Sequence, residues 1–289
     1  MSIPNRNLSG SETNYLHVEG IIALSAEELL LACGEKDMRA VSLLTGVAEH
    51  RTRISLYWHR MAVDTHTGTL LLSVRSPTGD FGQLVSLRQN GNRWVEVQRL
   101  DTRILVFDGN SYQIPFIVVC ESRVLLAKSG EHTLHVFDVS VEHTLREAGY
   151  VTLQSEFRRF ACIRRGNDTL IAFAQKSSVS LQRLTSLPLF RIEQVANVFV
   201  TNPCHLLFRG DLLLVVDCRW INGQDAVDIM LSFRASGNAL TERRVLLDAQ
   251  AGVSVGAVAL AGDRLVISDS NSGNLLVYAF TREFDGSAS

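Results

Sequence analysis

A short apolar run recurs six times along the chain, and this repeat limits the fold more than any other feature. Each run follows polar or turn-forming residues and precedes a polar loop and a stretch in which apolar residues alternate with others. The runs begin at Leu29, Leu70, Val124, Leu170, Leu212 and Leu265, with successive spacings of 41, 54, 46, 42 and 53 residues. Short apolar stretches bounded by turn residues at this near-regular spacing predict β-strands.

The mean spacing, about 47 residues, is close to the length of one blade of a β-propeller, about 40 to 50 residues. We therefore expect each unit to form a four-stranded antiparallel blade, and the whole to be an all-β, six-bladed β-propeller. The 289 residues and the 46% apolar content suit one large core. The expected domain covers residues 13–280, with flexible tails at 1–12 and 281–289.

Two segments resemble the repeats of known propellers. Gly262 to Tyr278 resembles the repeat of six-bladed NHL-type propellers, and Leu126 to Asp138 resembles the blade core of WD40-like propellers. The resemblance implies membership of the propeller superfamily, whose members include interaction scaffolds and also enzymes such as calcium-dependent lactonases.

The last repeat is one strand short. No apolar stretch follows Phe280, whereas Tyr15 to Glu19 alternates suitably and precedes the first full repeat. An exposed sheet edge is a hazard that closed folds remove. We therefore expect the N-terminal strand to pair in the last blade and to close the propeller.

Composition and cysteine spacing restrict the environment. The net charge of -2 gives no overall attraction to nucleic acid or to anionic membranes, and no stretch is apolar enough to cross a bilayer. The five cysteines are odd in number, lack metal-binding spacing and mostly lie in apolar runs, so we expect reduced thiols. With a polar N-terminus, Met1 to Asn14, we expect a cytoplasmic protein, with a nuclear location left open.

Motifs of common catalytic machinery are absent from the sequence, including GxSxG, GxxxxGK[ST] and HExxH. The residues expected where the innermost strands begin are chemically mixed, which disfavours a calcium site: Glu19, Arg60, Ile114, Phe160, Asn202 and Val255. We expect a non-catalytic protein with no cofactor and no metal.

Loops on one face offer the best candidate for a binding surface. In a propeller, the loops between blades and those between the second and third strands of each blade share one face, and binding residues concentrate in such loops. Here these segments are rich in Trp, Tyr and Arg, which dominate the energetic centres of protein interfaces. The expected partner-binding residues are Tyr57, Trp58, His59, Arg60, Phe81, Tyr112, Arg158, Arg159, His205, Arg219 and Trp220. The first hypothesis is an interaction platform, a scaffold or recognition subunit that binds a protein or peptide.

Two other functions stay open. A lactonase-like hydrolase would place Glu19, Asn202 and His205 at the site, with His205 as general base. RNA binding would use the cluster from Arg158 to Arg165. A purely structural alternative packs Trp58 and Trp220 between adjacent blades.

Overall fold

The computed structural model describes residues 18–33, 37–45, 48–53, 59–76, 81–91, 93–105, 115–185, 189–221, 225–236, 239–247, 252–270 and 274–280. These residues form 23 strands and, within this part of the chain, no helix. The strands form six antiparallel sheets, each built from consecutive strands that pair in chain order. The chain divides into two compact units, residues 1–54 with 253–289 and residues 55–252.

The first unit holds the first and last sheets. The first sheet contains β1 (Val18–Ala23), β2 (Glu28–Cys33), β3 (Asp37–Ser42) and β4 (Ala48–Arg53). The last sheet contains, among the described residues, β21 (Val255–Ala261), β22 (Arg264–Asp269) and β23 (Asn274–Ala279). Strands β1 and β21 contact each other.

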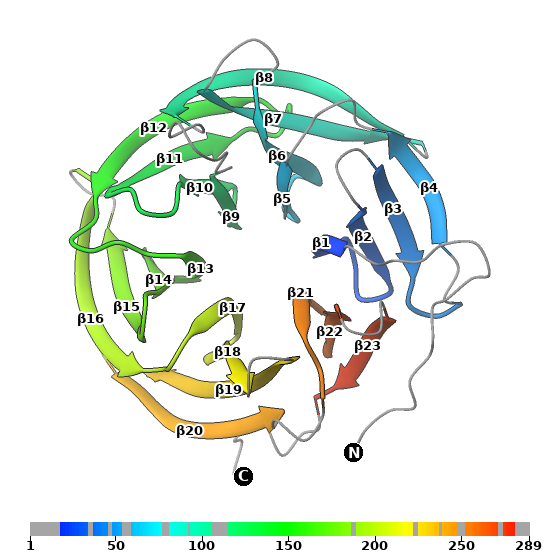
Figure 1. The fold of residues 1–289 in the computed structure, drawn as a ribbon. Coiled ribbons are helices and arrows are strands. Elements are labelled where there is room, and N and C mark those ends of the chain that lie inside the picture. The colour runs from blue at the N-terminus through cyan, green and yellow to red at the C-terminus, as the bar shows by residue number, and fades with distance from the viewer. Residues whose placement is uncertain are drawn as a thin grey trace. The chain divides into compact units, whose positions relative to one another are not determined.

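The second unit holds the four middle sheets. They are β5 (His59–Asp64), β6 (Thr69–Arg75), β7 (Phe81–Asn90) and β8 (Arg93–Leu105); β9 (Phe116–Cys120), β10 (Arg123–Ala127), β11 (Thr133–Val139) and β12 (Leu145–Thr152); β13 (Arg159–Arg165), β14 (Asp168–Ala174), β15 (Ser178–Thr185) and β16 (Arg191–Phe199); and β17 (Pro203–Arg209), β18 (Leu212–Ile221), β19 (Asp225–Ser236) and β20 (Ala239–Leu247). Within this unit the first strands lie innermost and the fourth strands outermost (Figure 1).

The six predicted apolar runs are the second strands of the six sheets, β2, β6, β10, β14, β18 and β22. Their central residues are almost fully buried, for example Leu71, Leu125 and Leu213, each with no exposed surface. A strand buried on both faces carries a continuous apolar sequence, whereas a strand buried on one face alternates. The repeat therefore marks the strand that is covered on both sides.

Hydrophobic clusters join neighbouring sheets within each unit. In the second unit, one cluster joins Leu170 of the β13–β16 sheet to Leu213 and Phe233 of the β17–β20 sheet. Another joins Leu125 of the β9–β12 sheet to Phe173 of the β13–β16 sheet. In the first unit, Leu29 and Leu31 pack with Ala257 and Val266. Within each unit, neighbouring sheets thus bury their faces against one another, as propeller blades do.

The chain is an all-β, six-bladed β-propeller, as the repeat predicts. The predicted closure is not confirmed. Val18 and Glu19 lie in β1, the first strand of the first blade, where Val18 pairs with Cys33. The rest of the expected closing strand, and both expected tails, lie outside the described residues.

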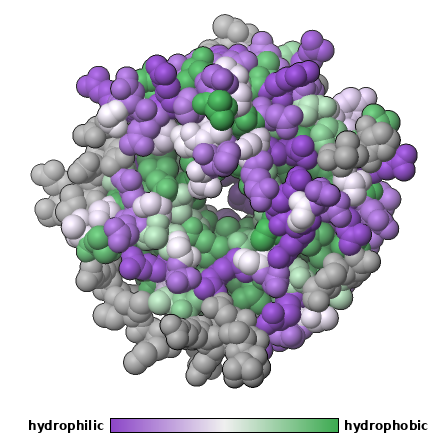
Figure 2. All heavy atoms as spheres, turned by 180° about the vertical axis from the view of Figure 1, so that it is seen from behind, coloured by the Kyte–Doolittle hydropathy of each residue, from purple (hydrophilic) through white to green (hydrophobic). Residues whose placement is uncertain are grey.

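Outer strands carry the solvent-facing surface. In β16 and β20 every residue is exposed or partly exposed, and charged side chains such as Arg191, Glu193 and Arg243 protect the sheet edge from pairing with other chains. Hydrophilic residues cover much of the face in Figure 2, and hydrophobic residues lie between them in small groups. The described residues include no helix with the length and apolarity needed to span a bilayer.

Substituting a buried leucine of a second strand tests the role of these strands. Leu213→Ala should lower the free energy of unfolding by about 2–5 kcal/mol, because it opens a cavity between two blades. Leu189→Ala removes the same atoms from a side chain that is 70% exposed and should change it by less than about 0.5 kcal/mol. Urea unfolding followed by tryptophan fluorescence measures both, and equal effects of the two changes would contradict this account.

Candidate functional site

Strand pairing in the second blade places the predicted loops at one end of the molecule's strands. His59 at the start of β5 pairs with Val74 near the end of β6, and Arg75 pairs with Gly82 at the start of β7. The beginning of the first strand and the connection between the second and third strands therefore lie at the same end, which also holds Phe81. We call this end, where the first strands of the second unit begin, the loop face.

Several predicted residues lie outside what the structure describes. Tyr57, Trp58 and Tyr112 are outside the described residues. His59 begins β5 and Arg219 and Trp220 lie in β18, but their side chains are not described. The alternative in which Trp58 and Trp220 pack between blades stays a prediction.

Five predicted residues of the loop face are described: Arg60, Phe81, Arg158, Arg159 and His205. Phe81 is 46% exposed and begins β7. Arg158 is exposed, and Arg60, Arg159 and His205 are partly buried.

Two of these arginines meet on one aromatic ring. The guanidinium carbon of Arg159 lies 4.6 Å from the ring centroid of Phe116, and that of Arg60 lies 5.2 Å from the same centroid. Arg60, Phe116 and Arg159 come from β5, β9 and β13, the first strands of three successive blades. Strand β9, which carries Phe116, contacts both β5 and β13. We call Arg60, Phe116 and Arg159 the arginine–phenylalanine cluster.

Phe116 was not among the residues predicted from the sequence. Its position supplies the signal that could have found it, because it opens β9 opposite Ala127 as Arg159 opens β13 opposite Ala174. Equivalent positions of neighbouring blades lie side by side, so Arg159 and Phe116 are expected neighbours once the register is known.

The cluster concentrates positive charge. Burial, and then the positive charge of Arg60, lower the pKa of Arg159 to about 10, so Arg159 remains protonated at neutral pH. Among the described residues, no carboxylate forms an ion pair with Arg159, which stacks on Phe116. The protein therefore holds a partly buried cation beside a second one.

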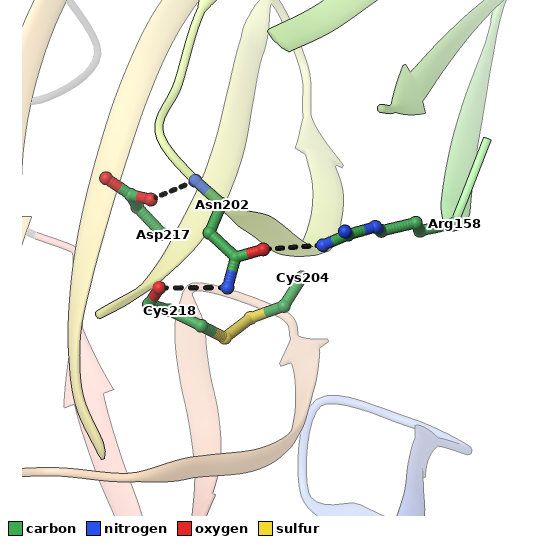
Figure 3. Close-up of a disulfide and its surroundings, with 5 residues drawn as sticks. All are labelled: Arg158, Asn202, Cys204, Asp217 and Cys218. Carbon is green, nitrogen blue, oxygen red and sulfur yellow. Dashed lines mark hydrogen bonds between the residues drawn. A yellow bond between two sulfur atoms is a disulfide. The ribbon is translucent and has the colours of Figure 1, made fainter. Parts of the chain in front are cut away.

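Arg158 does not stack on Phe116 as Arg159 does, but forms a hydrogen bond with Asn202. Its Nη1 donates a hydrogen bond of 2.6 Å to Oδ1 of Asn202 in the next blade. Asn202 donates from Nδ2 to the carbonyl oxygen of Cys218 at 3.1 Å and from its backbone N–H to Oδ1 of buried Asp217 at 2.7 Å. Figure 3 shows this chain of contacts beside the Cys204–Cys218 disulfide. The side-chain oxygen and nitrogen of Asn202 are thus both engaged within the protein.

The prediction of reduced thiols is wrong for one pair, because Cys204 and Cys218 form a disulfide. Counting outward from the turn at Gly210 would pair Cys204 with Asp217, but a bulge between Pro203 and His205 shifts the register. Cys204 sits in that bulge, and this irregularity brings it to Cys218. The sequence shows the 14-residue separation but not the bulge.

Two other cysteines confirm the prediction of free thiols. Cys120 in β9 and Cys162 in β13 are unpaired by disulfides. A hydrogen bond between the two thiols lowers the pKa of Cys120, and the same bond together with burial raises the pKa of Cys162. Each behaves as a small core residue between adjacent blades.

The arginine cluster from Arg158 to Arg165 does not form one patch. Arg158 and Arg159 lie at the loop face, whereas Arg164 and Arg165 lie at the opposite end of β13, about 20 Å away at the usual rise of a strand. There, Arg165 pairs with Asp211 and donates to the carbonyl oxygen of Gly210 at 2.9 Å. Strand geometry therefore separates the residues that the RNA-binding hypothesis needs together.

A pocket of about 410 Å³ lies at that opposite end, between the fourth and fifth blades. Its lining is charged but paired: Arg165 with Asp211, Arg183 with Asp168 at 3.6 Å, and Arg234 with Glu242 outside the lining at 3.1 Å. The charged side chains of this pocket therefore have partners within the protein, and the pair of Arg165 and Asp211 connects the fourth and fifth blades.

The residues proposed for a hydrolase are only partly placed. Glu19 lies in β1, but its side chain is not described, and both side-chain groups of Asn202 are hydrogen-bonded as above. His205 is partly buried in β17. In the described part of the chain, no group of three or more His, Cys, Asp or Glu residues could hold a metal ion.

Comparisons with known proteins identify the fold. No protein-family model and no curated protein sequence matches the chain. Solved structures do match: a putative oxidoreductase (glucose dehydrogenase) from Thermus thermophilus is 13% identical, with a TM-score of 0.63, and the match covers 94% of this chain and 98% of that one. A chain of the mitotic checkpoint complex is 11% identical, with a TM-score of 0.57 and coverage of 97% and 94%. The β-propeller domain of Myceliophteria thermophila Cps50 (Swd1) is 12% identical, with a TM-score of 0.55 and coverage of 91% and 84%. At these identities the likeness shows the propeller fold alone.

The disulfide should stabilise the fifth blade. A crosslink with a 14-residue separation constrains the unfolded chain by about 3 kcal/mol, so its loss should lower the melting temperature by about 5–10 °C. Calorimetry of the Cys204→Ser, Cys218→Ser double variant measures this effect. Reductant should lower the melting temperature of the wild type and leave that of the double variant unchanged, whereas equal sensitivity to reductant would contradict the assignment.

The same bond tests the predicted compartment. Disulfides persist in oxidising compartments and are rare in the cytosol. The Cys204–Cys218 bond and the expected cytoplasmic location therefore point in different directions, and the location stays a prediction. Free thiols blocked with N-ethylmaleimide at cell lysis and counted by mass spectrometry report the state of Cys204 and Cys218 in the cell. If the protein is cytoplasmic, both should carry the label, and an unlabelled pair would contradict that location.

Proposed function

We propose that the protein is a non-catalytic interaction platform, a scaffold or recognition subunit that binds a protein partner through the loop face. The observation that carries this proposal is the arginine–phenylalanine cluster, which gathers Arg60, Phe116 and Arg159 from three successive blades. Arginine and aromatic side chains dominate the energetic centres of protein interfaces. Exposed Phe81 and Arg158 extend the same chemistry across the loop face.

The comparisons support this proposal at the level of fold. Among the matching structures, one belongs to the mitotic checkpoint complex and another is the propeller domain of Swd1. Another is described as a putative glucose dehydrogenase, so the fold by itself also accommodates enzymes. The choice between these functions rests on the predicted residues of the loop face, of which the structure describes three arginines, one phenylalanine and one histidine.

Glutamate substitutions on the loop face should weaken partner binding. Tagged wild-type protein captures its partner from a lysate of its source cells, and Phe81→Glu and Arg158→Glu should each reduce the recovered partner at least about tenfold, as expected for residues near the centre of an interface. Arg146→Glu makes the same charge change on an exposed residue of outer strand β12 and should leave recovery unchanged. Quantitative mass spectrometry measures recovery, and melting temperatures show whether each variant is folded.

This proposal has two contrary outcomes. Recovery of no specific protein by the wild type would contradict it. So would a partner lost equally from the loop-face variants and from Arg146→Glu, because binding would then not depend on the loop face.

A further inference from the structure

Two free cysteines lie at the boundary where the third blade (β9–β12) packs against the fourth (β13–β16). Cys120 ends β9 and Cys162 lies in β13. Side chains of a strand alternate between its two faces. Phe116 and Val118 of β9 pack against the hydrophobic cluster of this boundary, so Cys120, two residues further along a regular strand, is directed to the same side. Cys162 packs against the same cluster from the fourth blade, and the two thiols therefore share one boundary.

Contacts on both sides of these cysteines join the same two strands. Towards the loop face, the guanidinium carbon of Arg159 in β13 lies 4.6 Å from the ring centroid of Phe116 in β9. At the other end, Nε of Arg164 in β13 lies 3.8 Å from Oε2 of Glu121, the residue that follows β9. The two cysteines lie between these contacts along their strands, so the packing of the blades holds them at the same level.

The two thiols interact with each other. A hydrogen bond between them lowers the pKa of Cys120, an effect to which the positive charge of Arg164 and the hydroxyl of Thr169 add. The same hydrogen bond, together with burial, raises the pKa of Cys162. Since the thiolate is the reactive form of cysteine, Cys120 is the nucleophile of the pair, and Cys162 is the thiol that donates to it.

Burial restricts what can react with this pair. Cys120 is buried and Cys162 is partly exposed. A disulfide reagent must bring its sulfur atoms into line with the attacking thiolate, which a packed boundary between blades does not permit. Hydrogen peroxide is scarcely larger than water and has no such requirement for space. The chemistry of the site therefore favours a peroxide as its oxidant.

We propose that Cys120 and Cys162 form a peroxide-sensitive dithiol site, whose oxidation joins the third and fourth blades by a disulfide. The Cys120 thiolate attacks one oxygen of hydrogen peroxide, the O–O bond breaks, and the hydroxide that leaves takes up the proton lost by the thiol. Cys162 then attacks the sulfur of the resulting sulfenic acid and displaces hydroxide, which forms water with the Cys162 proton. Two thiols are thus oxidised to one disulfide, and one peroxide is reduced to two water molecules.

This bond differs in its consequence from the disulfide already present. Cys204 and Cys218 are crosslinked within one blade, between its first and second strands. A bond between Cys120 and Cys162 would instead join two blades through β9 and β13, the strands that also carry Phe116 and its stacked arginine. Oxidation at this site would therefore restrain the boundary between blades.

A peptide map of the oxidised wild-type protein tests the inference. Trypsin places the two cysteines in separate peptides, residues 104–123 and 160–164. After treatment with hydrogen peroxide and blocking of the remaining thiols with N-ethylmaleimide, mass spectrometry should find these peptides linked in most molecules. The linked species should be two hydrogen atoms lighter than the sum of the two peptides and should disappear on reduction. A non-reducing gel should show the oxidised protein as a monomer.

The map also defines the contrary results. Peroxide that leaves both cysteines unmodified would overturn the inference. So would oxidation of Cys120 only to sulfenic or sulfinic acid, linkage of either cysteine to a different cysteine, or a disulfide-linked dimer. Because the map uses the wild type, none of these results depends on the folding of a variant.

Melting temperatures report whether the bond forms within the native packing. Cys120 and Cys162 are 42 positions apart, and a crosslink that closes a loop of this length should raise the melting temperature of the peroxide-treated wild type by about 5–10 °C. The Cys162→Ser variant cannot form the bond, so peroxide should not raise its melting temperature.

The Cys204→Ser, Cys218→Ser double variant is the matched control, because it lacks two cysteines of the same protein but keeps the pair at the boundary. Peroxide should raise its melting temperature by the same amount as that of the wild type. An equal rise in Cys162→Ser would place the reaction elsewhere and overturn the inference. A lower melting temperature in the crosslinked wild type would also overturn it, because the bond would then form only by displacing the blades.

Discussion

The burial of the second strand on both faces is the constraint on which the rest of this structure depends. A sheet whose central strand is apolar on both sides cannot satisfy itself alone, so it must lie between two others. Leu71, Leu125 and Leu213 show the result, each fully covered within the second unit. The first strands pair with these second strands and add residues such as Ile117, Phe160 and Leu206 to the core, so their ends are held in place.

Held ends allow unfavourable chemistry. Like charges repel more strongly where water is partly excluded, and the charge of Arg60 accordingly contributes to the lowered pKa of Arg159. Strands β5 and β13, which carry Arg60 and Arg159, pair with β6 and β14, and the packing of these blades places both guanidinium groups near Phe116.

The blades also show how one design varies while the backbone arrangement persists. In the fifth blade Asp217 accepts the backbone N–H that precedes β17, at 2.7 Å, and in the sixth Asp269 accepts the N–H that precedes β21, at 3.1 Å. Both first strands then bulge at their second residue, Cys204 and Gly256. A Cβ on Gly256 would lie 2.6 Å from Oγ of Ser270, the counterpart of Cys218, so the sixth blade closes this corner with a glycine where the fifth uses a disulfide.

The sequence by itself determined the number, order and class of the blades, because a strand covered on both faces must be apolar throughout and the spacing of such strands is visible in one dimension. It also indicated that the ends of the first strands carry arginine, as at Arg60 and Arg159. Only the tertiary structure decided which of these meet, since Arg60 and Arg159 are far apart in the chain and come together on Phe116 through the packing of three blades. The same holds for the bulge that joins Cys204 to Cys218: hydrophobic periodicity reports which face of a strand is covered, whereas register and side-by-side contact depend on irregularities that leave no periodic trace.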